Sequence, residues 1–288
     1  MPLHTSVLAT EALDALAIVP DGSYVDATFG AGGHTRLILE RLGPQGRVIA
    51  FDADPLAATL APDDPRLTLI HANFRALSDE LTARRISAVD GVLYDLGVSS
   101  MQLDDPARGF SFRSDAPLDM RLDPTHGETA ADYIVSHDEV DLADAIFRYG
   151  EERNSRRIAR TLKAKLPRTT GELAALVAAS VHVSGRRERI HPATKTFQAL
   201  RIAVNDELGA LRASLDAAAN LVRPAGRIAV ISFHSLEDRI VKLFFREDAR
   251  VHPLTRKPIV PSVEEVLSNP RARSAKLRAA TVEREVAA

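Results

Sequence analysis

The chain of 288 residues contains no cysteine, and none of its apolar runs approaches the ~20 residues needed to cross a bilayer. Without cysteine there is no disulfide, thiolate zinc site, iron–sulfur cluster or cysteine nucleophile. The first residues also lack the basic and then apolar pattern of a signal peptide. We therefore expect a cytoplasmic protein with no membrane partner, and the missing cysteine fits a reducing compartment.

Net charge is also nearly absent, at −2, which argues against a uniformly basic nucleic-acid binder. This small sum hides two blocks of opposite sign. Residues 102–147 hold 3 basic and 11 acidic side chains, whereas residues 148–201 hold 13 basic and 4 acidic ones, a net of +9. Two solvated helical faces that attract each other would explain this pattern. A polyanion-binding surface in the basic block would explain it equally well.

Short apolar runs alternate with helical patterns at both ends of the chain. This alternation is typical of βαβ units and a parallel sheet. The predicted strands are residues 23–28, 47–52, 67–71, 91–95, 227–232 and 276–282. The predicted helices at the two ends are residues 34–42, a helix after Pro55, a long helix at 197–221, and residues 236–246.

No buried strand is expected between about residues 103 and 200. Helices are predicted there at 138–149, 155–165 and 170–180, with a capping-box start at Thr169 and Glu172. The sequence therefore predicts an α/β domain made of residues 1–104 and 201–288. Residues 105–200 would form an inserted, mostly helical domain.

A glycine-rich turn, residues 30–33, follows the first predicted strand directly, and Asp52 ends the second. Glycines let a ligand approach the backbone closely, and the helix that follows offers free N–H groups. An acid about 20 residues after the turn is placed to accept hydrogen bonds from ribose hydroxyls. The pattern predicts a nucleotide-like ligand at the carboxyl ends of the strands.

Two cofactors use such a turn. The dinucleotide fingerprint requires a third glycine where this chain has Thr35. A site for S-adenosylmethionine requires an acid on the first strand, and Asp26 could organise both the turn and the cationic methionine end. The turn at residues 224–227, before a late apolar strand, also favours S-adenosylmethionine. An NAD-dependent oxidoreductase remains the alternative.

Longer motifs resemble one family, the bacterial 16S rRNA (cytosine-N4)-methyltransferases known as RsmH or MraW. The resemblance runs from His4 to about Arg278. It rests on residues 28–34 (TFGAGGH), 95–100 (DLGVSS), 108–112 (RGFSF), 117–121 (PLDMR), 149–152 (YGEE), 191–194 (HPAT), 232–238 (SFHSLED) and 269–274 (NPRARS).

The resemblance implies a class I, Rossmann-like methyltransferase sheet with an inserted helical domain. It implies methyl transfer from S-adenosylmethionine to the exocyclic N4 of a cytidine in the decoding centre of 16S rRNA, within the small ribosomal subunit. The cofactor contacts that it implies are Gly32, Gly33, His34, Asp52, Phe74, Asp95 and Gln102.

The exocyclic amine is a weak nucleophile, so we expect catalysis by alignment and by an acceptor for its proton. We predict Asp95 as the catalytic acceptor, with a purely cofactor-binding role as the alternative. His234 is an alternative base or stacking group. Residues 95–98 lack the Pro-Pro and aromatic residues that are common in methyltransferases acting on an exocyclic amine. The residues that hold the target base are therefore not assigned. The missing cysteine excludes a covalent adduct on the pyrimidine ring.

RNA affinity would come mainly from phosphate contacts. We predict Arg186 and Arg187 as substrate-binding residues. Further candidates are Arg153, Arg156, Arg157, Arg160, Lys163 and Lys165 on one helix, Arg189, and the group Arg271, Arg273 and Lys276. A non-catalytic assembly factor and a methyltransferase for DNA or protein remain alternatives. We expect no metal in the active site, while a homodimer and a metal that assists RNA binding stay open.

Overall fold

The computed structural model describes residues 6–181 and 191–283. The chain divides into two compact units, Met1–Gly97 with Leu208–Ala288, and Val98–Glu207. The borders expected from the sequence, 104/105 and 200/201, lie inside the second unit at both ends. Among the described residues, no helix is long and apolar enough to span a membrane.

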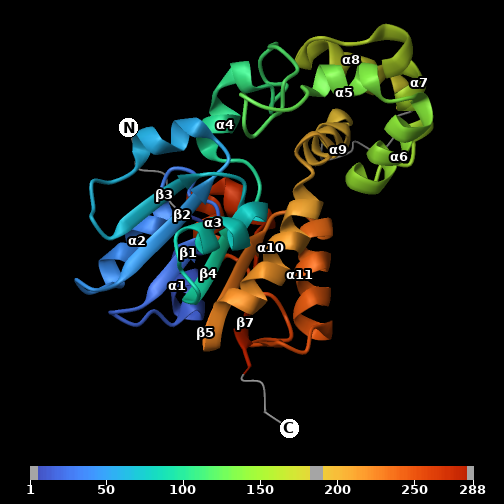
Figure 1. The fold of residues 1–288 in the computed structure, drawn as a ribbon. Coiled ribbons are helices and arrows are strands. Elements are labelled where there is room, and N and C mark those ends of the chain that lie inside the picture. The colour runs from blue at the N-terminus through green and yellow to red at the C-terminus, as the bar shows by residue number, and fades with distance from the viewer. Residues whose placement is uncertain (1–5, 182–190, 284–288) are drawn as a thin grey trace. The chain divides into compact units, whose positions relative to one another are not determined.

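The first unit is built on a seven-stranded sheet with the order β3-β2-β1-β4-β5-β7-β6 (Figure 1). The strands are β1 Ser23–Asp26, β2 Arg47–Asp52, β3 Leu67–His71, β4 Val89–Asp95, β5 Val222–Ser232, β6 Val251–Pro253 and β7 Lys276–Val282. Strands β1 to β5 are parallel, and β7 is antiparallel to both of its neighbours. The expected Rossmann-like α/β fold is confirmed. The strand order reverses between β1 and β4, where sheets of this kind bind ligands.

Side chains alternate between the two faces of this sheet, as the period of a strand requires. Leu93 of β4 packs with α1 (Ala9–Leu16) and α2 (Gly33–Arg41) on one face. Its neighbours Val92 and Tyr94 pack with α3 (Leu77–Ala83), α10 (Glu207–Leu221) and α11 (Ser235–Glu247) on the other. Both faces are covered, which explains why the central strands read as continuous apolar runs.

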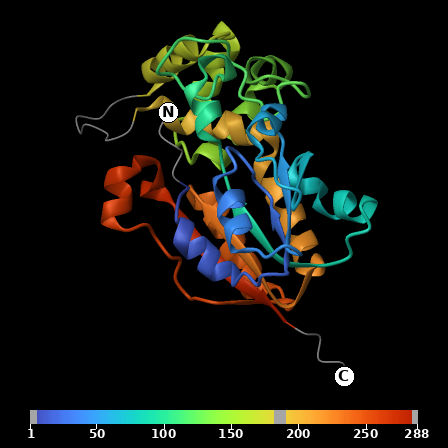
Figure 2. The ribbon, with the colours of Figure 1, turned by 90° about the vertical axis from the view of Figure 1, so that its left-hand side faces the viewer.

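The second unit is helical in its described part, as expected, and no strand of the sheet belongs to it. Its helices are α4 Ser100–Asp104, α5 Ala130–Ser136, α6 Glu139–Gly150, α7 Ser155–Lys165, α8 Thr170–Ser180 and α9 Ala193–Asn205 (green to gold in Figure 2). The predicted bounds of α7 and α8 are correct, and the capping box of Thr169 with Glu172 is confirmed. Residues such as Ile134, Leu142 and Leu200 form a separate core.

Short elements complete the chain. They are the 3-10 turns η1 Pro55–Leu60, η2 Phe74–Ala76, η3 Pro106–Arg108 and η4 Pro270–Ser274, and the helix α12 Val263–Ser268. The sequence predicted neither β6 nor α12, and the short helices α1, α3, α4 and α5 were missed as well. β6 and α12 are brief, and a run of three to six residues carries too little periodicity to be recognised.

Several sequence predictions are wrong at their boundaries, and three of them bear on the site. The helix expected at 197–221 is two helices, α9 and α10, because Asp206 adopts a left-handed conformation with φ 43°. The amide of Asn205 donates to Met120 O and Arg201 O, which holds the chain at this break. The first strand ends at Asp26 rather than residue 28. The turn expected at 224–227 lies within β5, where Ala225 has φ 69°.

Candidate active site

The end of β1 is tied to the start of α2 through Asp26. Its Oδ1 accepts a hydrogen bond from Thr28 N at 3.1 Å, and its Oδ2 accepts one from Thr35 Oγ1 at 2.6 Å. The carboxyl group is fully buried, and burial raises its pKa although the Thr35 hydrogen bond opposes this. The expected role of Asp26 in organising the turn is confirmed. Thr35, where a dinucleotide site would have glycine, provides the second half of this link.

The turn itself needs glycine at Gly32. Its φ is +75°, and a Cβ there would stand 2.6 Å from Cζ of the buried Phe29 ring. The guanidinium of Arg36 donates to Ala31 O and to Leu60 O, both at 2.6 Å. The sequence carried no signal for this arginine, whose backbone targets depend on the folded turn. Together these contacts hold the turn in one conformation.

Asp52 joins the second strand to the same turn. Its Oδ2 accepts a hydrogen bond from Gly30 N at 2.6 Å, and its Oδ1 accepts one from Asp54 N at 2.8 Å. Burial raises the pKa of Asp52 to about 6, although the two backbone N–H donors oppose this rise. Each carboxylate oxygen keeps further acceptor capacity. A ribose contact by Asp52 remains a prediction, and the structure shows that this carboxylate also shapes the turn.

Asp95 and His34 come together at the point where the strand order reverses. Asp95 N donates to Thr28 Oγ1 at 2.7 Å, which fixes the end of β4 against the glycine-rich turn. His34 Nε2, at the start of α2, lies 3.3 Å from Asp95 Oδ2. The Asp95 side chain is 24% exposed and that of His34 only 5%, so the imidazole is the more deeply buried member of this pair.

Burial opposes protonation of His34, but the Asp95 carboxylate 3.3 Å away, with the charge of Asp26, outweighs this effect and raises the imidazole pKa. Within the described part of the chain, neither ring nitrogen of His34 nor Oδ1 of Asp95 has a hydrogen-bond partner of good geometry. Buried polar atoms are rarely left so. These atoms therefore fit a polar ligand bound across the turn.

Phe74 and Gln102, two further expected cofactor contacts, lie in different units. Phe74 begins η2 after β3, and its half-buried ring meets Tyr94 edge-on, with centroids 5.8 Å apart. Gln102 belongs to the second unit, where it forms a capping box with Ser99 at the start of α4. Cofactor contacts by both residues remain predictions, as do those by Gly32, Gly33 and His34.

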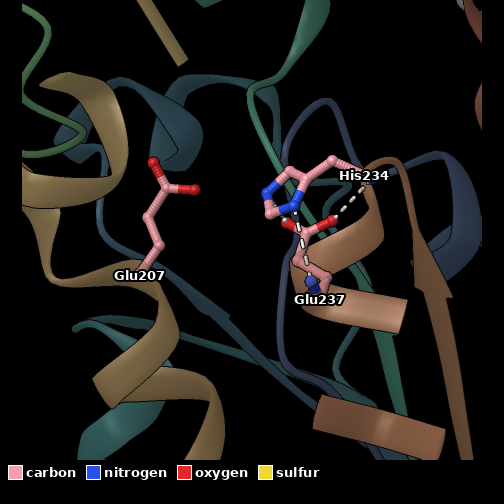
Figure 3. A group of neighbouring side chains, drawn as sticks. All are labelled: Glu207, His234 and Glu237. Carbon is pink, nitrogen blue, oxygen red and sulfur yellow. Dashed lines mark hydrogen bonds and ion pairs between the residues drawn. The ribbon is translucent and has the colours of Figure 1, made fainter. Parts of the chain in front are cut away.

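His234 caps α11 in this structure. Its Nδ1 accepts a hydrogen bond from Glu237 N at 3.4 Å, and its Nε2 lies 3.1 Å from Glu237 Oε1 (Figure 3). Glu237 Oε2 in turn accepts from Phe233 N at 2.9 Å. Figure 3 also draws Glu207, the first residue of α10, whose carboxylate pairs with Arg201 at 2.8 Å. The structure thus gives His234 a capping role, and its role as a base stays a prediction.

The basic candidates for RNA contact have different surroundings. Arg186 and Arg187, with Arg189, lie outside the described residues. Arg153 precedes α7 and was wrongly expected on that helix. Lys163 Nζ donates to the carbonyl oxygens that end α5, those of Ile134, Val135 and His137, at 2.9, 3.0 and 2.6 Å. Lys163 is therefore already used within the protein.

Comparison with known proteins gives a family and close relatives. The family model described as the MraW methylase family matches residues 1–283. A Chromobacterium violaceum protein named "Ribosomal RNA small subunit methyltransferase H" is 52% identical, over 96% of this chain and 94% of that protein. A protein of the same name from Nitrosospira multiformis is 47% identical over 96% of each. The solved structure of an rRNA methylase from Streptococcus thermophilus aligns with 95% of each chain, at TM-score 0.46 and 11% identity.

Proposed function

This chain belongs to the MraW methylase family, and from that membership we propose that it methylates the ribosomal RNA of the small subunit. The methyl donor is S-adenosylmethionine. The proposed target is the exocyclic N4 of a cytidine in the decoding centre of 16S rRNA. The family match over residues 1–283 carries this proposal, and two relatives about half identical to this chain bear a small-subunit rRNA methyltransferase name.

The arrangement around the glycine-rich turn supports a bound S-adenosylmethionine. Asp52 presents a carboxylate beside Gly30 N. His34 and Asp95 offer buried nitrogen and oxygen atoms that make no hydrogen bond within the described chain. When bound, the cofactor supplies an electrophilic methyl group. Residues of β1, β2 and β4 converge on this turn, so they can hold the cofactor's charged and hydroxyl groups at one edge of the sheet.

The amine of cytosine must lose a proton as its nitrogen forms the new bond to the methyl carbon and the sulfur–carbon bond breaks. We assign the acceptor role to Asp95, whose partly buried carboxylate lies at the end of β4 and has an oxygen, Oδ1, with no hydrogen-bond partner in the described chain. His34, at 3.3 Å, orients that carboxylate and stabilises its charge. The target base must leave its stack to reach this edge.

The basic residues of the second unit are the proposed RNA contacts, because phosphate binding needs clustered positive charge. Reversal of charge at Arg186 and Arg187 is expected to weaken binding of rRNA and to leave S-adenosylmethionine binding intact. Arg47, exposed at the amino end of β2, offers a matched control for charge reversal away from the proposed site. Unchanged rRNA affinity in the Arg186 and Arg187 variants would remove their assigned role.

Labelled S-adenosylmethionine and small subunits from a strain that lacks the modification test the proposed activity. Nuclease digestion and mass spectrometry are expected to show N4-methylcytidine. Label that appears only in another nucleotide, or in protein, would contradict the proposal.

A second experiment tests the role of Asp95. Asp95→Asn keeps the shape of the side chain but removes its capacity to accept a proton, so turnover should fall even when S-adenosylmethionine is saturating. Calorimetric measurement of cofactor affinity separates this effect from loss of binding. Normal turnover at saturation would leave Asp95 with a binding role alone.

A further inference from the structure

A cleft of about 410 Å³ opens in the first unit, and none of its lining residues belongs to the glycine-rich turn. It lies between the start of α11, the segment that leads into α12, and the stretch from η4 to β7. We infer that this cleft binds one nucleotide of the RNA substrate that flanks the target cytidine. The inference rests on the proposed function, because it assigns a second contact for the same substrate.

The position of the cleft places it beside the strand that carries Asp95. Asp95 and Ile231 are partners in the register of β4 and β5, and Leu96 N donates to Ile231 O at 3.0 Å. Two residues beyond Ile231, the ring of Phe233 lines the cleft. A Cβ built on Gly97 would stand 3.8 Å from this ring, so the chain leaving β4 runs past the cleft wall. The cleft thus opens at the carboxyl edge of the sheet, one strand from Asp95.

The lining of the cleft combines apolar and basic side chains. Phe233, Pro261 and Val266 supply apolar and aromatic surface, which suits the face of an unstacked base. Arg273 and Lys276 also line the cleft. Single-stranded RNA is bound by this combination of stacking surface and cations, and the volume lies within the range of about 300–1,000 Å³ typical of ligand pockets.

Cations outnumber the acid that pairs with them beside Lys276. Lys276 Nζ lies 3.2 Å from Asp238 Oδ2, and Arg278 Nε lies 2.7 Å from Asp238 Oδ1, so one carboxylate serves two cations. The exposed Arg273 makes no ion pair with any acid in the described residues. The cleft lining therefore keeps positive charge for a phosphate group.

Two matched pairs of variants test this inference, with fluorescence anisotropy of a labelled single-stranded oligoribonucleotide that contains cytidine. Arg273→Gln removes one cation from the cleft, and Arg47→Gln removes one from the amino end of β2, at the opposite edge of the sheet. Val260→Glu adds a carboxylate at the cleft wall. Val263→Glu adds one on α12, where the side chain is 72% exposed and does not line the cleft.

Arg273→Gln is expected to reduce the slope of log affinity against log salt by about 0.7, the value for one phosphate contact to a single strand. Val260→Glu is expected to weaken binding by about tenfold or more, because a carboxylate in the cleft would repel the negatively charged strand. Arg47→Gln and Val263→Glu should match the wild type. All four variants should bind S-adenosylmethionine normally.

Wild-type affinity and slope in both cleft variants would overturn the inference, and so would equal losses in the controls. A loss seen with whole small subunits but not with free RNA would also overturn it, since the cleft would then bind protein. Anisotropy measures RNA binding and does not depend on methyl transfer. The inference about the cleft can therefore be refuted without refuting the proposed methyltransferase function, and the reverse also holds. A wild-type protein that binds the oligonucleotide through the cleft but methylates no rRNA would refute the proposed function and support the inference.

Discussion

Substitution of Gly32 by alanine tests how tightly the glycine-rich turn is packed. At φ +75° a residue other than glycine costs about 1–2 kcal/mol. The added Cβ would also stand 2.6 Å from Phe29 Cζ, and the displacement of a buried ring costs about 1–3 kcal/mol more. We therefore expect Gly32→Ala to reduce the free energy of unfolding by about 2–5 kcal/mol.

Gly127→Ala is the matched control. Gly127 has a similar φ of +78°, but apart from its two chain neighbours no described residue has an atom within 4 Å of the position of its Cβ. This variant should lose only the conformational part, about 1–2 kcal/mol. The difference between the two variants measures the steric contact with Phe29.

Urea unfolding followed by circular dichroism gives both free energies, and calorimetric titration gives the affinity for S-adenosylmethionine. Displacement of Phe29 would move the turn from which Gly30 N donates to Asp52, so Gly32→Ala should also weaken cofactor binding, by about tenfold or more. Gly127→Ala should not. Equal losses of stability in the two variants, together with normal cofactor affinity, would refute the reasoning.

Three further predictions follow from side chains with buried or shared charges. Because burial raises the pKa of Asp52 to about 6, wild-type affinity for S-adenosylmethionine should fall about tenfold from pH 7 to pH 5 as the carboxylate is protonated. Calorimetry on Asp52→Asn should show a smaller fall in affinity between pH 7 and pH 5. A fall as large as that of the wild type would contradict the ribose contact. The raised pKa of His34 means that its pair with Asp95 stabilises the fold most below pH 6.5 and is lost as pH rises through that raised value. Urea unfolding of His34→Gln at pH 6 and pH 9 should show a smaller change in the free energy of unfolding than the wild type. An equal change in both proteins would show that the pair of His34 with Asp95 does not stabilise the fold. Lys163→Met should lower the free energy of unfolding by about 1.5–3 kcal/mol, since it removes the charged donor to α5, whereas the exposed Lys165→Met should have little effect. Equal losses in these two lysine variants would deny the capping role.

Much of the first unit could be predicted because its signals are local. The strands at 47–52, 67–71 and 276–282 have the predicted bounds, since each is a short apolar run between turn residues. The glycine-rich turn and Asp52 follow from the same alternation, because a strand end and the turn after it are adjacent in sequence.

The break between α9 and α10 could not be predicted in the same way. Residues 197–221 have helical periodicity throughout, and the left-handed Asp206 depends on contacts of Asn205 with Met120, far away in the sequence. The strand expected to reach residue 28 stops at Asp26 for a related reason. The hydrogen bond that Thr28 N donates to Asp26 bends the chain there.

The amino-acid sequence by itself determined the class of fold and the residues of the turn, because hydrophobic period and glycine placement act over a few residues. Only the tertiary structure decided which side chains meet. In the folded chain His34 Nε2 lies 3.3 Å from Asp95 Oδ2, and Lys163 donates hydrogen bonds to the carbonyl oxygens at the end of α5. Phe233, Pro261 and Arg273 line one cleft. Each of these depends on how strands and helices distant in the sequence pack together, and no local pattern encodes such a contact.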